Sequence, residues 1–161
     1  MYFDRTFVEP YFKLLFRLKG VTQNPKYHNG NDVYIHSLQV TKWALREANN
    51  NDLVFAALSH DFGKMIETKG HEDHSCEMIK DIASVKTIWL VKHHLRGRWY
   101  LTGEMRKLKK CKDLVNHPWW SELCQLIRWD TMGRKPNYLW EITIDDFIDR
   151  INKIAERQFK I

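Results

Sequence analysis

The adjacent pair His60-Asp61 is the feature of this sequence with the clearest chemical potential. An apolar run at 53–58 leads directly into the pair, and Gly63 and Lys64 follow it. Because neighbouring helix residues point about 100° apart, one turn can present an imidazole and a carboxylate at different angles. The imidazole can bind one ion while the two carboxylate oxygens bridge to a second. The pair alone also fits a helix end that meets solvent, so its meaning depends on the groups around it.

Further potential metal ligands occur in otherwise apolar helical stretches. They are His36, His71, His74, His93, His94 and Asp130. A helical protein buries such groups only when they are paired or bound to metal, because an isolated buried charge is strongly unfavourable. The sequence therefore predicts one shared metal centre between packed helices.

The order His36, His60-Asp61 and Asp130, with Gly-Lys after the pair, resembles the HD-domain superfamily of metal-dependent phosphohydrolases. The resemblance runs over roughly residues 28–135. Residues 34–38, 70–72 and 89–94 are similar to the HD domain attached to some bacterial tRNA nucleotidyltransferases, and no nucleotidyltransferase domain is expected within this sequence. The extra histidines resemble the binuclear branch, which includes diiron oxygenases such as inositol oxygenase and phosphonate-cleaving enzymes.

Six residues form the candidate ligand set: His36, His60, Asp61, His71, His94 and Asp130. Four neutral imidazoles and two carboxylates bring a charge of −2 to two divalent ions carrying +4, so the centre stays positive and attracts phosphate. Mixed ligands of this kind suit Mn, Fe, Co, Ni or Zn. Two such ions lower the pKa of bound water and clamp the oxygens of an in-line displacement. Asp61 is the candidate bridge, with a catalytic role. If only His36, His60, Asp61 and Asp130 bind metal, the site holds one ion and the other histidines act on substrate.

Other residues are candidates for contact with substrate. The resemblance implies that Lys64 contacts the substrate anion, which makes it a catalytic and substrate-binding candidate. Only one of His93 and His94 can face the metal with ideal geometry. Similarity to the inositol oxygenase pattern favours His94, and His93 is then a substrate-binding candidate. His74 is either a partner of a ligand or a surface histidine.

A basic run after the paired histidines is a candidate rim for phosphates. It comprises Lys92, Arg96, Arg98, Arg106, Lys107, Lys109, Lys110 and Lys112, of which Arg96 and Arg98 are substrate-binding candidates. Taken singly, each of these cations also fits a solvated helix face or loop. Aromatic pairs at 99–100 and 119–120 lie beside polar or turn residues. One of these rings could line a substrate pocket, although packing is their simpler role.

The elements that must position these groups are helices. Near absence of β-branched alternation predicts an all-α fold, an HD-domain helical bundle with the metal site between packed helices. Helices are expected at 7–18, 33–48, 75–83 and 85–94, with another starting at Pro118 and a last one at about 143–159 capped by Thr143. Asp32 is expected to cap the helix at 33–48. Residues 95–117 are predicted to be loop-like with a short basic helix.

Length and composition set broader limits. The 161 residues, 43% apolar, predict a single globular domain over 1–161. No stretch approaches the roughly 20 apolar residues of a membrane helix. The N-terminus lacks a signal-peptide pattern, so a cytoplasmic protein without a membrane partner is expected. Three cysteines without CxxC spacing are predicted to be buried free thiols. The net charge of +6 favours anionic substrates.

Together these features predict a metal-dependent phosphohydrolase that acts on a nucleotide or an RNA-terminal phosphoester, as a phosphomonoesterase or cyclic phosphodiesterase. The expected partner is a phosphorylated small molecule, a nucleotide or an RNA end. Two alternatives stay open. One is a diiron oxygenase that cleaves a C–C or C–P bond, for which His71 and His94 complete the six-ligand pattern. The other is a nucleic-acid-binding module with a vestigial metal site.

Overall fold

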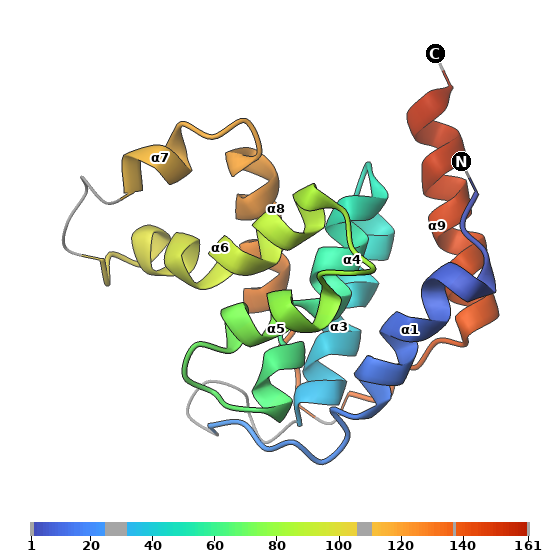
Figure 1. Ribbon diagram of the computed structural model, residues 1–161, viewed down its shortest axis with the longest axis horizontal. Coiled ribbons are helices and arrows are strands. Elements are labelled where there is room, and N and C mark those ends of the chain that lie inside the picture. Colours follow the sequence, from blue (N-terminus) through green and yellow to red (C-terminus); the bar gives the residue numbers. More distant parts are fainter. Residues whose placement is uncertain (1, 25–31, 106–110, 137, 161) are drawn as a thin grey trace.

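The computed structural model describes residues 2–24, 32–105, 111–136 and 138–160, and within these ranges every regular element is a helix (Figure 1). The elements are α1 (Arg5–Phe16), α3 (Val33–Glu47), α4 (Asn51–Ser59), the short 3-10 helix η1 (Phe62–Met65), α5 (His71–Ile79), α6 (Val85–Leu101), α7 (Lys112–Val115), α8 (Trp120–Met132) and α9 (Ile144–Phe159). The predicted all-α fold is confirmed. None of the helices in these ranges is both long and apolar enough to cross a membrane.

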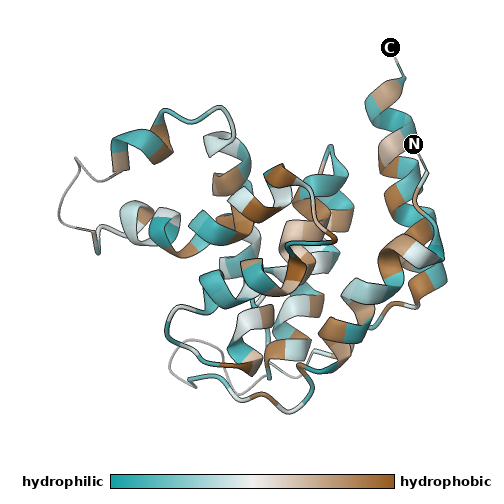
Figure 2. Cartoon of the chain, viewed as in Figure 1, coloured by the Kyte–Doolittle hydropathy of each residue, from teal (hydrophilic) through white to brown (hydrophobic). Residues whose placement is uncertain are grey.

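Helix α4 lies at the centre of the molecule and packs against α1, α3, α6, α8 and α9 (Figure 1). All of its residues except Asp52 are buried, because its neighbours cover it on every side. Figure 2 shows hydrophobic residues concentrated on α4, whereas hydrophobic and hydrophilic residues alternate along α9. The buried residues of α9 recur at the helical spacing that forms one apolar face: Phe147, Ile151, Ile154 and Ala155. This arrangement places the C-terminal end of α4, with His60 and Asp61, between the surrounding helices.

Side-chain caps fix where several helices begin. Asp32 accepts a hydrogen bond from the Ile35 N–H at the start of α3, as predicted, and a second from the Gly20 N–H. Thr143 accepts one from the Asp146 N–H at the start of α9, which confirms the predicted cap. Such caps satisfy backbone donors that the first helical turn leaves without partners.

The prediction that residues 95–117 are loop-like is wrong for 95–101, because α6 continues to Leu101. The reason is tertiary packing at Gly97. A Cβ there would lie 2.8 Å from Cδ1 of Ile127, so the glycine allows α6 to approach α8 closely. Within the rest of the described segment, α7 is a short helix as expected, but it is not basic, because Lys112 is balanced by Asp113. Arg106, Lys107, Lys109 and Lys110 of the basic run lie outside the described residues.

Smaller differences concern helix ends. The first helix covers Arg5–Phe16 rather than 7–18, because the Asp4 side chain accepts from the Phe7 N–H and so starts it earlier. Helix α5 begins at His71, directly after Gly70 with its positive φ of 70°. Of the three thiols, Cys111 is buried, while Cys76 and Cys124 are only half-buried.

Candidate metal centre

All six predicted ligands converge in one buried region between five segments of the chain. His36 comes from α3, His60 and Asp61 from the end of α4, His71 from the start of α5, His94 from the middle of α6 and Asp130 from the end of α8. None of the six is more than 4% exposed. Their potential ligand atoms form two groups that share Asp61, and within each group the atoms lie within 4.8 Å of one another.

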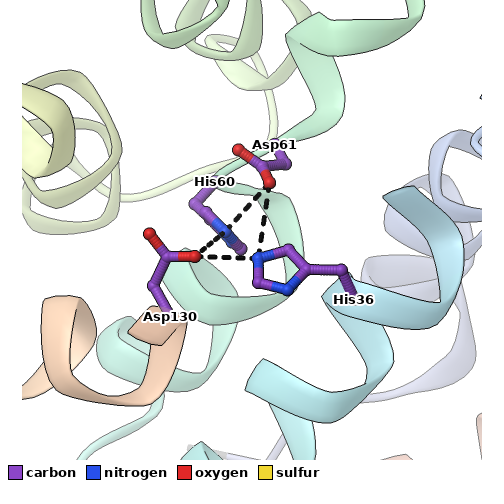
Figure 3. A group of neighbouring side chains, drawn as sticks. All are labelled: His36, His60, Asp61 and Asp130. Atoms are coloured by element: carbon purple, nitrogen blue, oxygen red, sulfur yellow. Dashed lines mark hydrogen bonds and ion pairs between the residues drawn. The ribbon is translucent and has the colours of Figure 1, made fainter. Parts of the chain in front are cut away.

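The first group contains His36, His60, Asp61 and Asp130 (Figure 3). Nε2 of His36 lies 2.8 Å from Oδ1 of Asp130 and 3.6 Å from Oδ2 of Asp61. Nε2 of His60 lies 3.3 Å from Oδ2 of Asp61 and 3.4 Å from Oδ1 of Asp130. Two imidazole nitrogens and two carboxylate oxygens thus point at one common space.

The second group contains Asp61, His71 and His94. It uses the other oxygen of Asp61. Oδ1 lies 3.0 Å from Nε2 of His71 and 3.8 Å from Nε2 of His94. The carboxylate of Asp61 therefore presents one oxygen to each group, which is the arrangement expected of a bridging ligand.

Backbone carbonyls orient all four imidazoles. Nδ1 of each ring donates to a carbonyl oxygen, and the pairs are His36 to Gly133 at 2.7 Å, His60 to Ala57 at 2.8 Å, His71 to Thr68 at 3.0 Å and His94 to Val91 at 2.5 Å. Because a carbonyl can only accept, Nδ1 carries the proton in each ring, and Nε2 of a neutral ring is left with its lone pair. This is the second contact that metal-binding histidines usually make.

The atoms that face the shared space fit a divalent cation. His60 Nε2 is buried and makes no hydrogen bond within the part of the chain that the structure describes, and the buried Asp61 Oδ2 has the Lys64 ammonium at 3.0 Å as its ion-pair partner. Nε2 of His71 and Nε2 of His94 lie 3.3 Å apart, and in neutral rings both would present lone pairs to each other. A cation placed among these atoms would satisfy them, because buried polar atoms without partners are costly.

The pKa values of the ligand residues also indicate that this centre favours positive charge. Burial lowers the pKa of His60, but the carboxylates of Asp61 and Asp130 outweigh it and raise that pKa to about 10. Burial and the neighbouring His60 and His71 lower the pKa of His94 to about 3. Burial opposes ionisation of Asp61 and Asp130, yet the surrounding cationic groups hold both of their pKa values well below the ordinary range.

Two close contacts hold the His-Asp turn against α5. Ser75 Oγ accepts from the Gly63 N–H at 2.7 Å and donates to the carbonyl of His60 at 3.0 Å. A Cβ on Gly63 would lie 2.0 Å from the carbonyl oxygen of His71, so only glycine allows η1 to approach α5 this closely. These contacts bring His71 to the Asp61 carboxylate.

Two cations lie against the carboxylates. Nζ of Lys64 is 3.0 Å from Oδ2 of Asp61 and 3.0 Å from Oε1 of Gln23. Nη1 of Arg98 is 3.2 Å from Oδ2 of Asp130. Arg98 lies one helical turn after His94 on α6, so both project from the same face of that helix. The predicted substrate residues Lys64 and Arg98 therefore do lie at the centre.

A cavity of about 500 Å³ adjoins the second ligand group. Its wall includes His71, Lys64, Lys69, Arg98, Trp99 and Arg134. Trp99, from the aromatic pair at 99–100, lines this cavity and is 40% exposed. Lys69 and Arg134 were not among the sequence candidates. The signal for Arg134 is its position four residues after Asp130, at the end of α8.

Other predicted residues lie elsewhere. The ring of His93 packs on Trp89 with centroids 4.8 Å apart, while its neighbour His94 faces the centre. Burial, with the charges of Arg96 and Lys92, lowers the pKa of His93 to about 4. Arg96 forms an ion pair with Asp113 at 2.6 Å. His74 lies 3.5 Å from Glu67 at the surface. The structure thus brings neither His93 nor Arg96 into the ligand groups.

The fold and the buried His-Asp centre together define the class of protein: an all-helical domain with potential metal ligands buried between its helices. The family model described as HD domain matches residues 33–128, which is more than half of the sequence. The chain therefore belongs to the HD domain family.

Curated relatives are similar to part of this chain. A Multifunctional CCA protein of Methylobacillus flagellatus is 33% identical over 106 residues, which cover 56% of this chain and 25% of the relative. A protein of the same name from Thioalkalivibrio sulfidiphilus is 39% identical over 70 residues, which cover 39% of this chain and 17% of the relative. Another from Cupriavidus necator is 28% identical over 139 residues, which cover 74% of this chain and 34% of the relative. The chain thus spans at most about a third of the length of these relatives.

Proposed function

We propose that this protein is a metal-dependent phosphohydrolase that cleaves a phosphoester of a nucleotide or of an RNA terminus, as a phosphomonoesterase or a cyclic phosphodiesterase. One observation carries the proposal: two groups of ligand atoms share the carboxylate of Asp61 beside a cavity whose lining contains more lysine and arginine than glutamate. The name Multifunctional CCA protein, borne by the relatives, supports a nucleotide or RNA substrate. It agrees with the resemblance to HD domains attached to tRNA nucleotidyltransferases.

The proposed centre holds two divalent ions among Mn, Fe, Co, Ni and Zn, which suit a mixed imidazole and carboxylate set. His36, His60, Asp61 and Asp130 would hold one ion, and Asp61, His71 and His94 the other. Such ions supply positive charge and lower the pKa of bound water. The four carbonyl contacts keep each Nε2 aimed inward, so the chain fixes the ligand directions in advance.

Lys64 and Arg98 are proposed to bind the phosphate oxygens. The ammonium of Lys64 has three donors, and Asp61 and Gln23 engage two of them, which leaves one for a substrate oxygen. The guanidinium of Arg98 has five N–H donors and contacts Asp130 through one nitrogen. Both cations would stabilise charge that develops on a phosphoryl group, in a partly buried place where such contacts are strong.

The cationic cavity also bears on the diiron oxygenase alternative. That function needs the same pairing of two ligand groups through Asp61, so the centre alone is compatible with both. The lining has an excess of cations over the carboxylates of Glu72 and Glu104, which favours an anionic substrate such as a phosphoester or a phosphonate. Experiment must therefore decide whether the protein hydrolyses a phosphoester bond or cleaves a C–C or C–P bond with oxygen.

The test is hydrolysis of a phosphoester panel by wild type and Asp61→Ala, each loaded with Mn, Ni, Fe, Zn or Mg. The panel contains nucleoside mono-, di- and triphosphates, 2′,3′-cyclic nucleotides and an aryl phosphate. Asp113→Ala is the matched control, because it removes an exposed carboxylate paired with Arg96 away from the ligand groups. We expect activity in wild type and the control and loss of at least a hundredfold in Asp61→Ala, because second-sphere changes alone cost about 10- to 100-fold.

Two outcomes would contradict this function. Oxygen consumption with a phosphonate or polyol by protein carrying two irons, without hydrolysis of any phosphoester, would establish the oxygenase. Absence of hydrolysis from protein that binds no metal would leave the nucleic-acid-binding module.

A further inference from the structure

A second cavity, of about 220 Å³, lies on α3 and the segment after α8, apart from the ligand groups. Its lining includes Gln39, Lys42, Trp43, Arg46, Lys135 and Tyr138, with no carboxylate among the described residues that line it. Three cations and two aromatic rings thus surround a space that the metal centre does not use. A cavity with this lining favours an anionic ligand that also has a flat ring.

The cations of this cavity lie over aromatic rings. Nζ of Lys42 is 5.5 Å from the ring centroid of Tyr138 and 5.6 Å from that of Trp140. The guanidinium of Arg46 is 5.5 Å from the ring of Trp43. Glu47, which follows Arg46 in sequence, is engaged by Arg128 at 2.8 Å and by the indole N–H of Trp129 at 3.0 Å. The nearby Glu47 carboxylate is thus occupied by Arg128 and Trp129.

The segment after α8 connects this cavity with the metal centre. The side chain of Gln39 donates to the carbonyl of Lys135 at 2.8 Å and accepts from its N–H at 2.9 Å, which fixes the segment on α3. Just before it, the Gly133 carbonyl accepts from His36. Arg134 lines the first cavity and Lys135 lines the second. The two cavities are therefore lined by adjacent residues of this segment, whose Cα atoms are about 3.8 Å apart.

We propose that the second cavity binds a backbone phosphate and the adjoining base of a single-stranded RNA whose terminal phosphate lies in the cavity at the metal centre. Lys42, Arg46 and Lys135 would contact the phosphate, and Trp43 or Tyr138 would stack on the base. Base stacking on aromatic rings beside a positive groove is how proteins bind single strands without reading sequence. The proposal deepens the proposed function and rests on it for the position of the RNA end.

Binding is tested with the metal-loaded full chain and a short, fluorescently labelled single-stranded RNA that ends in a 3′-hydroxyl, so that no terminal phosphate can be cleaved. Fluorescence anisotropy gives Kd over a range of salt concentrations. Lys42→Ala/Arg46→Ala removes two cations of the cavity. Its matched control, Lys13→Ala/Lys153→Ala, removes two exposed cations from α1 and α9.

We expect the cavity variant to raise Kd about tenfold and to reduce the slope of log Kd against log salt by up to about 0.7, because the two cations share one phosphate and each neutralised phosphate of a single strand contributes about 0.7. The control should retain the Kd of wild type within about twofold. Of Trp43→Ala and Tyr138→Ala, the variant that loses the stacking ring should weaken binding about tenfold with an unchanged salt slope, since stacking releases no counterions; wild-type binding in both variants would overturn the stacking contact. Absence of RNA binding by wild type, equal losses in the two double variants, or equally tight binding of a polyglutamate peptide would overturn the proposal.

Hydrolysis assays distinguish failure of the proposed RNA site from failure of the proposed hydrolase function. An oligoribonucleotide with a terminal phosphate and a mononucleotide with the same terminus are compared as substrates. Lys42→Ala/Arg46→Ala should raise KM for the oligoribonucleotide about tenfold and leave the mononucleotide unchanged. Unchanged KM for both substrates would overturn the RNA site while the hydrolase stands. Cavity-dependent RNA binding without hydrolysis of either would overturn the hydrolase while the RNA site stands.

Discussion

Asp61 is the side chain that both ligand groups share, with Oδ2 towards His36 and His60 and Oδ1 towards His71. Such a carboxylate links the two groups chemically, so its loss should act on both. Each histidine of the second group, by contrast, belongs to that group alone. Substitution of Asp61 and substitution of a second-group histidine should therefore change the amount of bound metal differently.

We predict that Asp61→Ala lowers bound metal from two ions per chain to none, whereas His94→Ala lowers it to one. The reason is that the first change removes an oxygen from both groups and the second removes a nitrogen from one. Metal content of protein purified with Mn or Fe is measured by elemental analysis, with circular dichroism as the check on folding. Two ions retained in Asp61→Ala would show that this carboxylate does not bridge.

At the scale of elements, the centre depends on how η1 is attached to α5. Ser75 is fully buried, and its hydroxyl joins the Gly63 N–H to the carbonyl of His60. Because the same turn carries Asp61 and the start of α5 carries His71, this small hydroxyl controls the geometry between the two ligand groups. The position of Ser75 in the sequence does not reveal this role.

We predict that Ser75→Ala lowers the free energy of unfolding of the metal-free protein by about 1–3 kcal/mol, because two buried backbone groups lose a partner. Urea unfolding followed by circular dichroism measures this. The matched control is Ser121→Ala on the exposed face of α8, which should stay within about 0.5 kcal/mol of wild type. Equal stabilities for the two variants would contradict the role of Ser75.

Helix α1 carries a titratable group within the core. Burial raises the pKa of Tyr11 well above its ordinary value, and the Asp52 carboxylate adds to the effect. Unfolded tyrosine ionises near pH 10. Above that pH the unfolded chain binds fewer protons than the folded chain, so the free energy of unfolding falls as pH rises.

We predict that Tyr11→Phe makes this alkaline decline shallower, because the variant keeps the ring and removes the ionisable hydroxyl. The hydroxyl contributes only a long contact of 3.4 Å to the carbonyl of Ile82. Urea unfolding at a series of pH values from about 8 to 11 measures the slope. The same slope in wild type and variant would exclude Tyr11 as its source.

At the scale of the whole molecule, α1 and α9 pack on each other and on α4, the helix that delivers His60 and Asp61 (Figure 1). Phe147 of α9 is fully buried and contacts the rings of Phe12 and Phe55. We therefore propose that residues 1–161 form a single domain, in which the terminal helices and the metal centre unfold together.

We predict that Phe147→Ala lowers the free energy of unfolding by about 3–5 kcal/mol, as expected for an emptied core position. Neither α1 nor α9 contains tryptophan, so tryptophan fluorescence reports on the rest of the molecule and circular dichroism on all helices. Both probes should shift to the same lower midpoint of urea unfolding. A shift in dichroism with an unchanged fluorescence midpoint would show that α1 and α9 form a separate unit.

The all-α class and the candidate ligands can be predicted from the sequence alone. Both follow from local information: apolar periodicity marks helices, and His or Asp residues inside apolar stretches need partners when they are buried. His36, His60, Asp61 and Asp130 also follow an order that resembles a family. The HD domain match confirms the family, and the ligand roles stay predictions.

Which side chains reach the centre depends on how the helices pack in three dimensions. His93 and His94 are adjacent in sequence, yet the face that α6 turns towards α4 and α5 selects His94. Arg98 reaches Asp130 because α6 continues past Gly97, where close approach to α8 favours the helix over the predicted loop. The cavity on α3 joins residues about a hundred positions apart in sequence. Such contacts depend on how helices pack, and no local pattern along the chain encodes them.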